Sequence, residues 1–185
     1  RNRQCHACPF QTMSRYQPVR GRAGRQPCHD RQVEPVTIDN VKDAARLLEP
    51  VIKRTPTMSA GWINKTHGVN VSFKCENLQR AGSFKIRGAY NRIARLPESD
   101  RAKGVVAASA GNHAQGVALG AARMQCKAII VMPVTTPQVK IDAVKDRGGQ
   151  WVEIVLHGES YNDAYDHSLA LEKKHKLTFI HPFDD

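Results

Sequence analysis

The stretch Val105-Val106-Ala107-Ala108-Ser109-Ala110-Gly111-Asn112-His113-Ala114-Gln115-Gly116 passes from an apolar run through a small polar loop into residues typical of a helix. Residues 105–108 predict a strand buried on both faces, because all four are apolar. The loop leads into a helix predicted over 112–124, whose alanines would let it pack closely on a sheet. A strand followed directly by a helix is the repeating unit of a parallel α/β sheet.

The same alternation continues to the end of the chain. Further strands are predicted at 128–131, 151–156 and 177–180, and further helices at 137–147 and 160–175. Within helix 137–147 the residues expected to point inward are Val139, Ala143 and Val144. The pattern predicts an α/β fold, with a parallel sheet covered by helices on both faces. Right-handed crossovers would place every strand-to-helix loop at the carboxyl edge of this sheet.

The loop from Ser109 to Gly116 is the first of these strand-to-helix connections. Backbone amides at a helix N-terminus bind anions without any cationic side chain. Gly111 and Gly116 would let the backbone approach a ligand. A plain turn joining a strand to a helix is the alternative. The loop matches neither the dinucleotide fingerprint nor the P-loop, which argues against nucleotide binding by those routes.

Upstream, the stretch Ser83-Phe84-Lys85-Ile86-Arg87-Gly88 places one lysine behind a bulky aromatic residue. A helix is predicted over 84–95, so Lys85 would lie in its first turn, directly after a loop. Such a lysine has two interpretations. One is a solvated surface amine, which is the commoner situation. The other is a partly buried amine, whose neutral form attacks carbonyl groups to give Schiff bases.

The folded sequence is expected to begin near Thr37-Ile38-Asp39, where Thr37 or Asp39 would cap a helix that ends before Pro50. The apolar face of this helix is predicted to contain Val41, Ala44, Ala45 and Leu48. Residues 55–57 are predicted to be an extended linker, and residues 70–76 a strand.

Taken together, the two stretches resemble the threonine dehydratase and serine racemase family, the pyridoxal-phosphate enzymes of fold type II. The resemblance covers the chain from about Val36 to its last residue. Four more pieces carry it, in the same order as in the family: Glu76-Asn77-Leu78-Gln79-Arg80, Val131-Met132-Pro133, Leu156-His157-Gly158 and His181-Pro182-Phe183-Asp184.

The resemblance implies a role for each matching residue. Lys85 would carry pyridoxal 5'-phosphate as a Schiff base, Phe84 would pack beside this cofactor, and Asn112 would hydrogen-bond the hydroxyl group of its ring. The substrate carboxylate would be held by donors of Ser109, Ala110, Gly111, Asn112 and His113. The His113 side chain itself is expected to be a packed imidazole rather than a proton-transfer group. No metal is expected in this site.

The implied reaction converts L-threonine, or serine, to a 2-oxo acid and ammonia, with Lys85 removing the Cα proton. Racemases of the family have a serine at the position of Ala110, which offers a proton on the opposite face of the cofactor. Ala110 has no such proton, so the sequence favours a dehydratase. Serine racemase activity, and a fragment without catalytic activity, are the alternatives.

The resemblance also implies an incomplete chain. Residues 36–95 would be the N-terminal part of a large catalytic domain, and residues 96–185 a small parallel-sheet subdomain. Family members continue into a glycine-rich phosphate loop, and nothing in residues 36–185 resembles that loop. The full-length protein is expected to be a homo-oligomer that acts on a small amino acid, without membrane or nucleic-acid partners.

Composition fits a cytoplasmic enzyme. The net charge is +11, of which an excess of five positive charges falls in residues 1–35, and the chain has five cysteines without a disulfide framework. Residues 1–35 contain no lysine and show no apolar periodicity, so they are expected to be disordered or non-native. The alternatives for this segment are an organelle transit peptide, an arginine arm that binds phosphates, and a zinc site at Cys5, His6, Cys8, Cys28 and His29.

Overall fold

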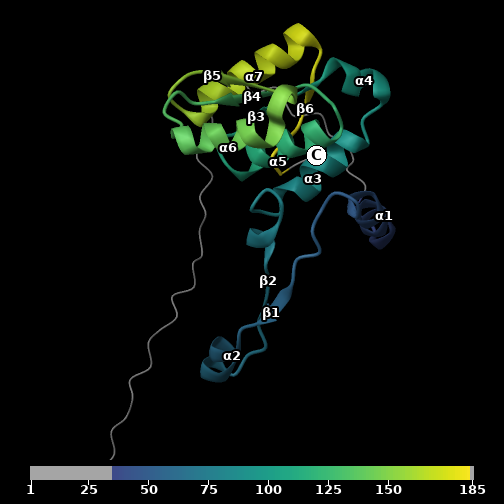
Figure 1. Ribbon diagram of the computed structural model, residues 1–185, viewed down its shortest axis with the longest axis vertical. Helices are drawn as coiled ribbons and strands as arrows, with labels where there is room; N and C mark the ends of the chain where they lie inside the picture. The colour runs from purple at the N-terminus through teal and green to yellow at the C-terminus, as the bar shows by residue number, and fades with distance from the viewer. Residues whose placement is uncertain (1–34, 184–185) are drawn as a thin grey trace, which may run out of the picture. The chain divides into compact units, whose positions relative to one another are not determined.

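The computed structural model describes residues 35–183. The predictions for the Arg-rich segment, including the zinc site, fall outside these residues apart from Pro35. The elements in chain order are α1 (Ile38–Leu48), β1 (Thr57–Ser59), α2 (Gly61–His67), β2 (Ser72–Lys74), the 3₁₀ helix η1 (Glu76–Leu78), α3 (Lys85–Ala94), α4 (Glu98–Lys103), β3 (Val105–Ala108), α5 (Asn112–Arg123), β4 (Ala128–Met132), α6 (Gln138–Gly148), the 3₁₀ helix η2 (Gly149–Trp151), β5 (Val152–Leu156), α7 (Tyr161–His175) and β6 (Thr178–Phe179) (Figure 1).

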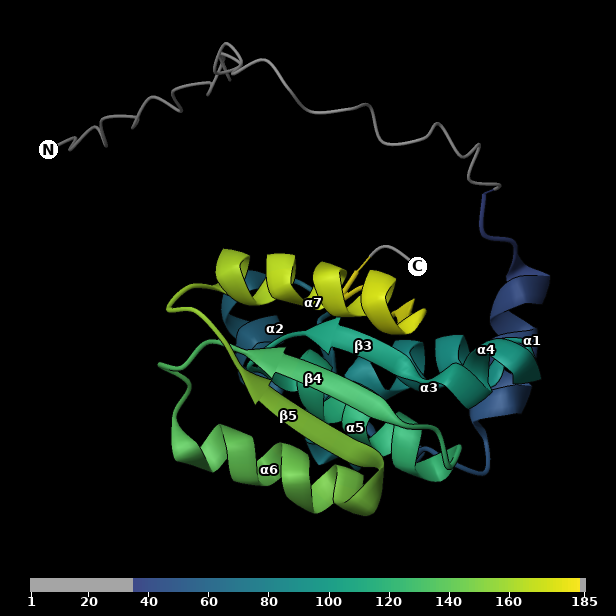
Figure 2. The ribbon, with the colours of Figure 1, turned by 90° about the horizontal axis from the view of Figure 1, so that it is seen from above.

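Strands β3 to β6 form a four-stranded sheet in the order β5-β4-β3-β6, and every neighbouring pair is parallel. Helices α5 and α6 lie on one face of this sheet and α7 on the other (Figure 2). The prediction of a parallel sheet covered on both faces is therefore confirmed. The chain steps from β3 to β4 to β5 in one direction, and α7 then carries it back so that β6 pairs with the free side of β3.

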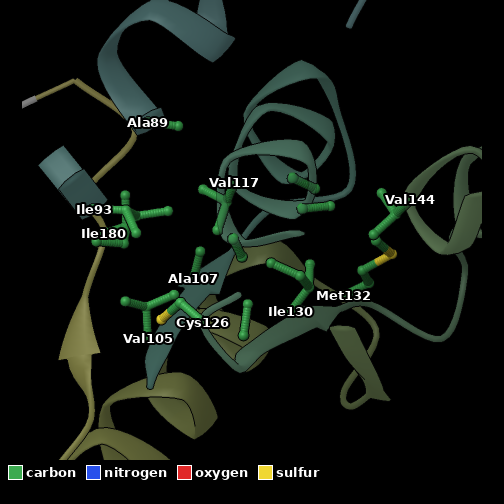
Figure 3. Packing of buried hydrophobic residues seen from close by; sticks show 14 of the residues in the cluster. Ala89, Ile93, Val105, Ala107, Val117, Cys126, Ile130, Met132, Val144 and Ile180 are labelled. Atoms are coloured by element: carbon green, nitrogen blue, oxygen red, sulfur yellow. The ribbon is translucent and has the colours of Figure 1, made fainter. Parts of the chain in front are cut away.

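Both faces of the central strand β3 are buried, which explains its unbroken apolar sequence. Val105 and Ala107 belong to the core beneath α5 and α6, whereas Val106 packs with Val131 and Ala164 on the side of α7. Figure 3 shows the first of these cores, in which Val117 of α5 and Met132 of β4 are fully buried. Successive residues of a strand point to opposite faces, so the alternation follows directly from strand geometry.

Helices α3 and α5 make the most extensive helix–helix contact among the described elements. Two glycines of α5 allow it. A Cβ on Gly116 would lie 2.9 Å from the carbonyl carbon of Lys85, and one on Gly120 would lie 3.4 Å from the Cα of Tyr90. The sequence-based prediction that Gly116 admits a ligand is thus replaced by another role: Gly116 admits the backbone of α3.

The orientation of α6 differs from the prediction. Val139 was expected to point inward, but it is 70 % exposed, and Ile141 and Val144 form the buried side of the helix. Val139 precedes Ile141 by two residues, which is about 200° around a helix. Ala143 is half-buried. The predicted buried face was therefore wrong at Val139, in the first turn of the helix, and correct at Val144.

Helix α1 begins as predicted, with Thr37 accepting a hydrogen bond from the Asn40 amide in a capping box. Its apolar face was predicted too broadly. Leu48 alone is buried in this helix, where it packs with Ile86 and Tyr90 of α3, while Val41 is 52 % exposed.

The segment between α1 and η1 also departs from the prediction. Strand β1 starts at Thr57, inside the predicted linker, and pairs antiparallel with β2, which is shorter than the predicted strand 70–76. Helix α2 was not predicted. None of the residues of β1, α2 and β2 is buried.

Cys126 closes the α5–β4 connection. Its side chain is 1 % exposed, and its thiol donates to the carbonyl oxygens of Arg101 and Lys127 at 3.3 and 3.5 Å. Burial raises the pKa of this thiol above its ordinary value. A buried free cysteine of this kind behaves as a small hydrophobic residue.

Within residues 35–183, no helix combines the length and the apolar character that a membrane crossing requires.

Candidate active site

A cavity of about 450 Å³ lies beside the start of α3 and the segment that follows β6. Strands β3 and β6 are neighbours, and α5 follows β3 on one face of the sheet whereas α7 leads into β6 across the other face (Figure 2). In open α/β sheets, ligands bind at such a switch point, outside the carboxyl ends of the strands. The cavity is lined by Phe84, Lys85, Gly88, Ala89, Asn91, Arg92, Arg95, His113, Ile180, His181, Pro182 and Phe183.

Lys85 is the first residue of α3 and so lies in the first turn of the helix, as predicted, and it is partly buried. Its amine donates a hydrogen bond to the carbonyl oxygen of Pro182. The same amine lies 5.1 Å from the centre of the Phe84 ring, within the range of a cation–π contact. The lysine side chain is therefore directed into the cavity rather than into solvent.

His113, the second residue of α5, lines the same cavity but is buried. Its Nε2 lies 2.9 Å from the carbonyl oxygen of Ile180, which suits an Nε2–H donor. The Ile180 amide in turn donates to the Val106 carbonyl. His113 thereby fixes the chain after β6 to the start of α5, which agrees with the prediction of a packed imidazole.

The remaining predicted residues lie beside the cavity and are not part of its lining. Ser109, Ala110 and Gly111 form the half-buried turn between β3 and α5, in which the Gly111 amide donates to Ser109 Oγ at 3.2 Å. Asn112 is the exposed first residue of α5, one turn before Gly116. Residues four apart share a helix face, so Asn112 lies on the side of α5 that approaches Lys85.

The cavity has a strongly cationic lining. Lys85, Arg92 and Arg95 contribute three basic side chains, two histidines stand beside them, and no acidic residue is part of the lining. The two arginines follow Lys85 along α3. A cavity with this charge favours an anionic ligand.

Behind α3, on the side away from this cavity, Glu76 forms a second polar cluster. Its carboxylate accepts from Arg87 Nε and Nη2 at 2.8 Å each and from Thr55 Oγ1 at 2.6 Å. The guanidinium of Arg87 lowers the pKa of Glu76 from 4.5 to about 2. The same bond raises the pKa of Arg87.

One buried polar atom bears on the implied cofactor. The Ser83 hydroxyl, two residues before Lys85, is buried and has no hydrogen-bond partner among the described residues. A buried hydroxyl without a partner is rare, and a polar group of a bound ligand would satisfy it. With the Lys85 amine in the cavity and the Phe84 ring beside it, the residues present fit an anionic carbonyl compound such as pyridoxal phosphate.

Fold and cavity together define a class: an α/β protein that presents a lysine amine at the switch point of a parallel sheet. Residues 48–185 match the family model described as pyridoxal-phosphate dependent enzyme, so the chain belongs to this family.

Within this family, the chain is similar to curated threonine dehydratases and ammonia-lyases. The chain is 59 % identical over 115 residues to the biosynthetic L-threonine dehydratase of Burkholderia multivorans, a match that covers 62 % of this chain and 23 % of the relative. It is 45 % identical over 150 residues to the L-threonine ammonia-lyase of Thermotoga maritima, covering 81 % of this chain and 37 % of the relative. The chain thus spans well under half the length of these two relatives.

Solved structures agree with the fold. The processed form of threonine deaminase isoform 2 from Solanum lycopersicum superposes with a TM-score of 0.71 at 43 % identity, over 81 % of this chain and 42 % of that one. Maize serine racemase superposes with a TM-score of 0.74 at 38 % identity, over 80 % of this chain and 44 % of that one. The similarity therefore extends to both the dehydratases and the racemases of the family.

Proposed function

We propose that the protein to which this chain belongs is a pyridoxal-phosphate dependent threonine dehydratase, which converts L-threonine to 2-oxobutanoate and ammonia. The single observation that supports the proposal most is the Lys85 amine in a cationic cavity at the switch point of the sheet. The two relatives described above, a threonine dehydratase and a threonine ammonia-lyase, share 59 and 45 % of the aligned residues.

The residues divide the work as follows. Lys85 would hold the cofactor covalently through Nζ, and Phe84 would pack beside it. Ser83 and Asn112 offer a hydroxyl and an amide as donors to its polar groups. Main-chain and hydroxyl donors of Ser109, Ala110, Gly111, Asn112 and His113 would bind the substrate carboxylate, since backbone amides at a helix N-terminus favour anions.

Pyridoxal phosphate, when bound, supplies an electron-accepting ring that makes the Cα proton of an amino acid acidic. Lys85 Nζ would accept this proton as a general base. The β-hydroxyl group then leaves as water, and a water molecule replaces the amino group, which is released as ammonia. Threonine thus yields one 2-oxobutanoate and one ammonia, with no oxidant or reductant.

The cofactor assignment is tested by adding pyridoxal phosphate to the 185-residue chain and recording the absorbance of a lysine-bound cofactor. Borohydride reduction followed by peptide mass mapping should place the label on Lys85. Lys85→Ala should abolish the band, whereas Lys127→Ala, at an exposed lysine, should keep it. Label spread evenly over surface lysines would refute the assignment.

Ala110 favours the dehydratase over the racemase. In a chain that releases ammonia from L-threonine or L-serine, we expect this release to be faster than the interconversion of serine enantiomers. The reverse order of rates would favour serine racemase. A chain that binds the cofactor at Lys85 but turns over neither substrate would indicate that further residues are needed for catalysis.

We also propose a cytoplasmic location, as expected for an enzyme of amino-acid metabolism.

A further inference from the structure

Helix α3 presents three consecutive residues, Lys85, Ile86 and Arg87, to three different partners. Lys85 binds the Pro182 carbonyl at the cavity, Ile86 is fully buried against Leu48 and Tyr90, and Arg87 binds Glu76. Residues two positions apart lie about 200° apart around a helix. Lys85 and Arg87 therefore project to opposite sides, and each lines a different cavity.

The start of α3 lacks the device that usually fixes a helix N-terminus. Its N-cap residue is Phe84, and no side chain caps the free amides. Without a cap, the rotation of the first turn depends on the contacts of Lys85, Ile86 and Arg87. Among these, the paired hydrogen bonds between Arg87 and Glu76 have the most exacting geometry, because a guanidinium and a carboxylate meet in one plane.

Glu76 is itself anchored. Thr55, which is 4 % exposed, donates to the carboxylate, and Lys74 donates to the Thr55 carbonyl oxygen. Three residues further on, the Gln79 side chain exchanges two hydrogen bonds of 2.8 Å with the backbone of Lys53. The loop that leads to Lys85 is thus hydrogen-bonded to residues 53–55 at two points. Glu76 connects this loop to α3 through its hydrogen bonds with Arg87.

We propose that Glu76 is a positioning residue for Lys85: through Arg87 it fixes the rotation of the first turn of α3 that directs the Lys85 amine into the cavity. The inference rests on the proposed function for its consequence in cofactor binding, but the positioning can be measured without the cofactor. It gives a role to the Glu76-Asn77-Leu78-Gln79-Arg80 stretch, which the proposed reaction does not use directly.

Two variants test the positioning in the full 185-residue chain. Glu76→Gln removes the charge and one acceptor at nearly constant size, and Arg87→Lys keeps the charge but loses the planar fork. Two controls accompany them. Asp100→Asn removes an ion pair with Lys103 far along the chain, and Ser160→Ala removes the cap of α7 and so lowers stability elsewhere.

The first readout is acylation of individual lysines by an N-hydroxysuccinimide ester, followed by mass spectrometry under conditions where every variant is folded by circular dichroism. In both test variants we expect the rate at Lys85, relative to exposed Lys127 and Lys145, to rise at least threefold. Amide exchange in residues 85–88 should rise about tenfold. Neither quantity should change in the two controls.

The second readout is the share of reductively trapped pyridoxal phosphate on Lys85, which should fall at least threefold in Glu76→Gln and Arg87→Lys. The double variant Glu76→Gln/Arg87→Lys should be no worse than the more impaired of its single variants, since residues acting as one unit are not additive. Unchanged Lys85 acylation in both folded test variants, or an equal change in Ser160→Ala, would overturn the inference. A wild-type chain that fails to take the cofactor at Lys85 would instead refute the proposed function, while the acylation and exchange data still decide the role of Glu76.

Discussion

Gly116 of α5 lies directly against Lys85 of α3, so close that a Cβ at position 116 would be 2.9 Å from the lysine carbonyl carbon and 3.0 Å from its oxygen. Both contacts are with backbone, which a rotamer change cannot relieve. The candidate cofactor lysine is therefore located by a helix–helix contact as well as by its own side-chain partner. The contact joins the two sequence stretches from which the family resemblance was drawn.

Gly116→Ala is expected to destabilise the protein. Overpacking costs roughly 1–3 kcal/mol, and the helix preference of alanine offsets about 1 kcal/mol of that. Gly88→Ala provides a matched control in the middle of α3, because a Cβ there meets nothing within 4 Å. In urea unfolding, Gly88→Ala should be neutral or stabilising. A Gly116→Ala chain as stable as wild type would contradict the close contact.

Acid should weaken the Glu76–Arg87 pair in a defined range. The pKa of Glu76 is about 2 in the folded chain against an ordinary 4.5. Its stabilising contribution is therefore complete above pH 4.5 and is lost as the pH falls toward 2. Glu76→Gln should be less stable than wild type at neutral pH and should lose less stability over that interval.

Urea unfolding at a series of pH values measures this difference. Asp100→Asn serves as the control, because its pair with Lys103 is more exposed and contributes at most about 1 kcal/mol. Parallel pH profiles for wild type and Glu76→Gln would show that the pair adds nothing to acid stability.

Alanine substitutions at two glycines with positive φ would distinguish the cost of backbone strain from the cost of steric overlap. Gly149 has φ +53° and open space at its Cβ position, whereas Gly158 has φ +67° and a Cβ position 2.0 Å from that of Asp163. Alanine at 149 should cost roughly 1–3 kcal/mol, because φ +53° with ψ −133° lies outside the regions that residues with a Cβ adopt readily. Alanine at 158 should cost more in thermal or urea unfolding, because it also displaces the capping Asp163. Equal costs would argue against the overlap.

His113 should be structural. His113→Leu would leave the buried Ile180 carbonyl oxygen without its donor, at a cost of roughly 1–3 kcal/mol. His113→Gln keeps an N–H donor and should lose less. Amide exchange of Ile180, whose amide pairs with Val106, should accelerate more in the leucine variant than in the glutamine variant. If both variants keep wild-type exchange, the His113–Ile180 contact does not hold the segment after β6.

The sheet could be predicted from the sequence because its strands are short, apolar and regularly separated by helices. Val105 to Ala108 is apolar throughout, and the structure buries both of its faces. The order of the strands could not be predicted, because it depends on the side to which α7 returns the chain rather than on any local pattern. Helix α2 was not predicted because it has no buried side, so its sequence shows no apolar periodicity of a helix.

The residues of the site that lie on α3 and in the β3–α5 turn could likewise be predicted, but their partners from distant parts of the chain could not. Lys85 at the beginning of a helix, and the turn from Ser109, follow from local sequence. The partner of Lys85 is the Pro182 carbonyl, 97 positions away, and a backbone oxygen has no sequence signature. The roles of Glu76 and Arg87 depend in the same way on a pairing across eleven positions. The assignment of Asn112 and of the carboxylate donors, and the division at residue 95, stay predictions.

The buried thiol of Cys126 can be used to measure how often the core opens. A thiol-specific reagent can modify this side chain only during moments when the packing between α5 and β4 opens, since 99 % of its surface is covered otherwise. The rate of its modification, followed by mass spectrometry, therefore reports how often the packing between α5 and β4 opens, in any variant that keeps Cys126 and without an introduced cysteine.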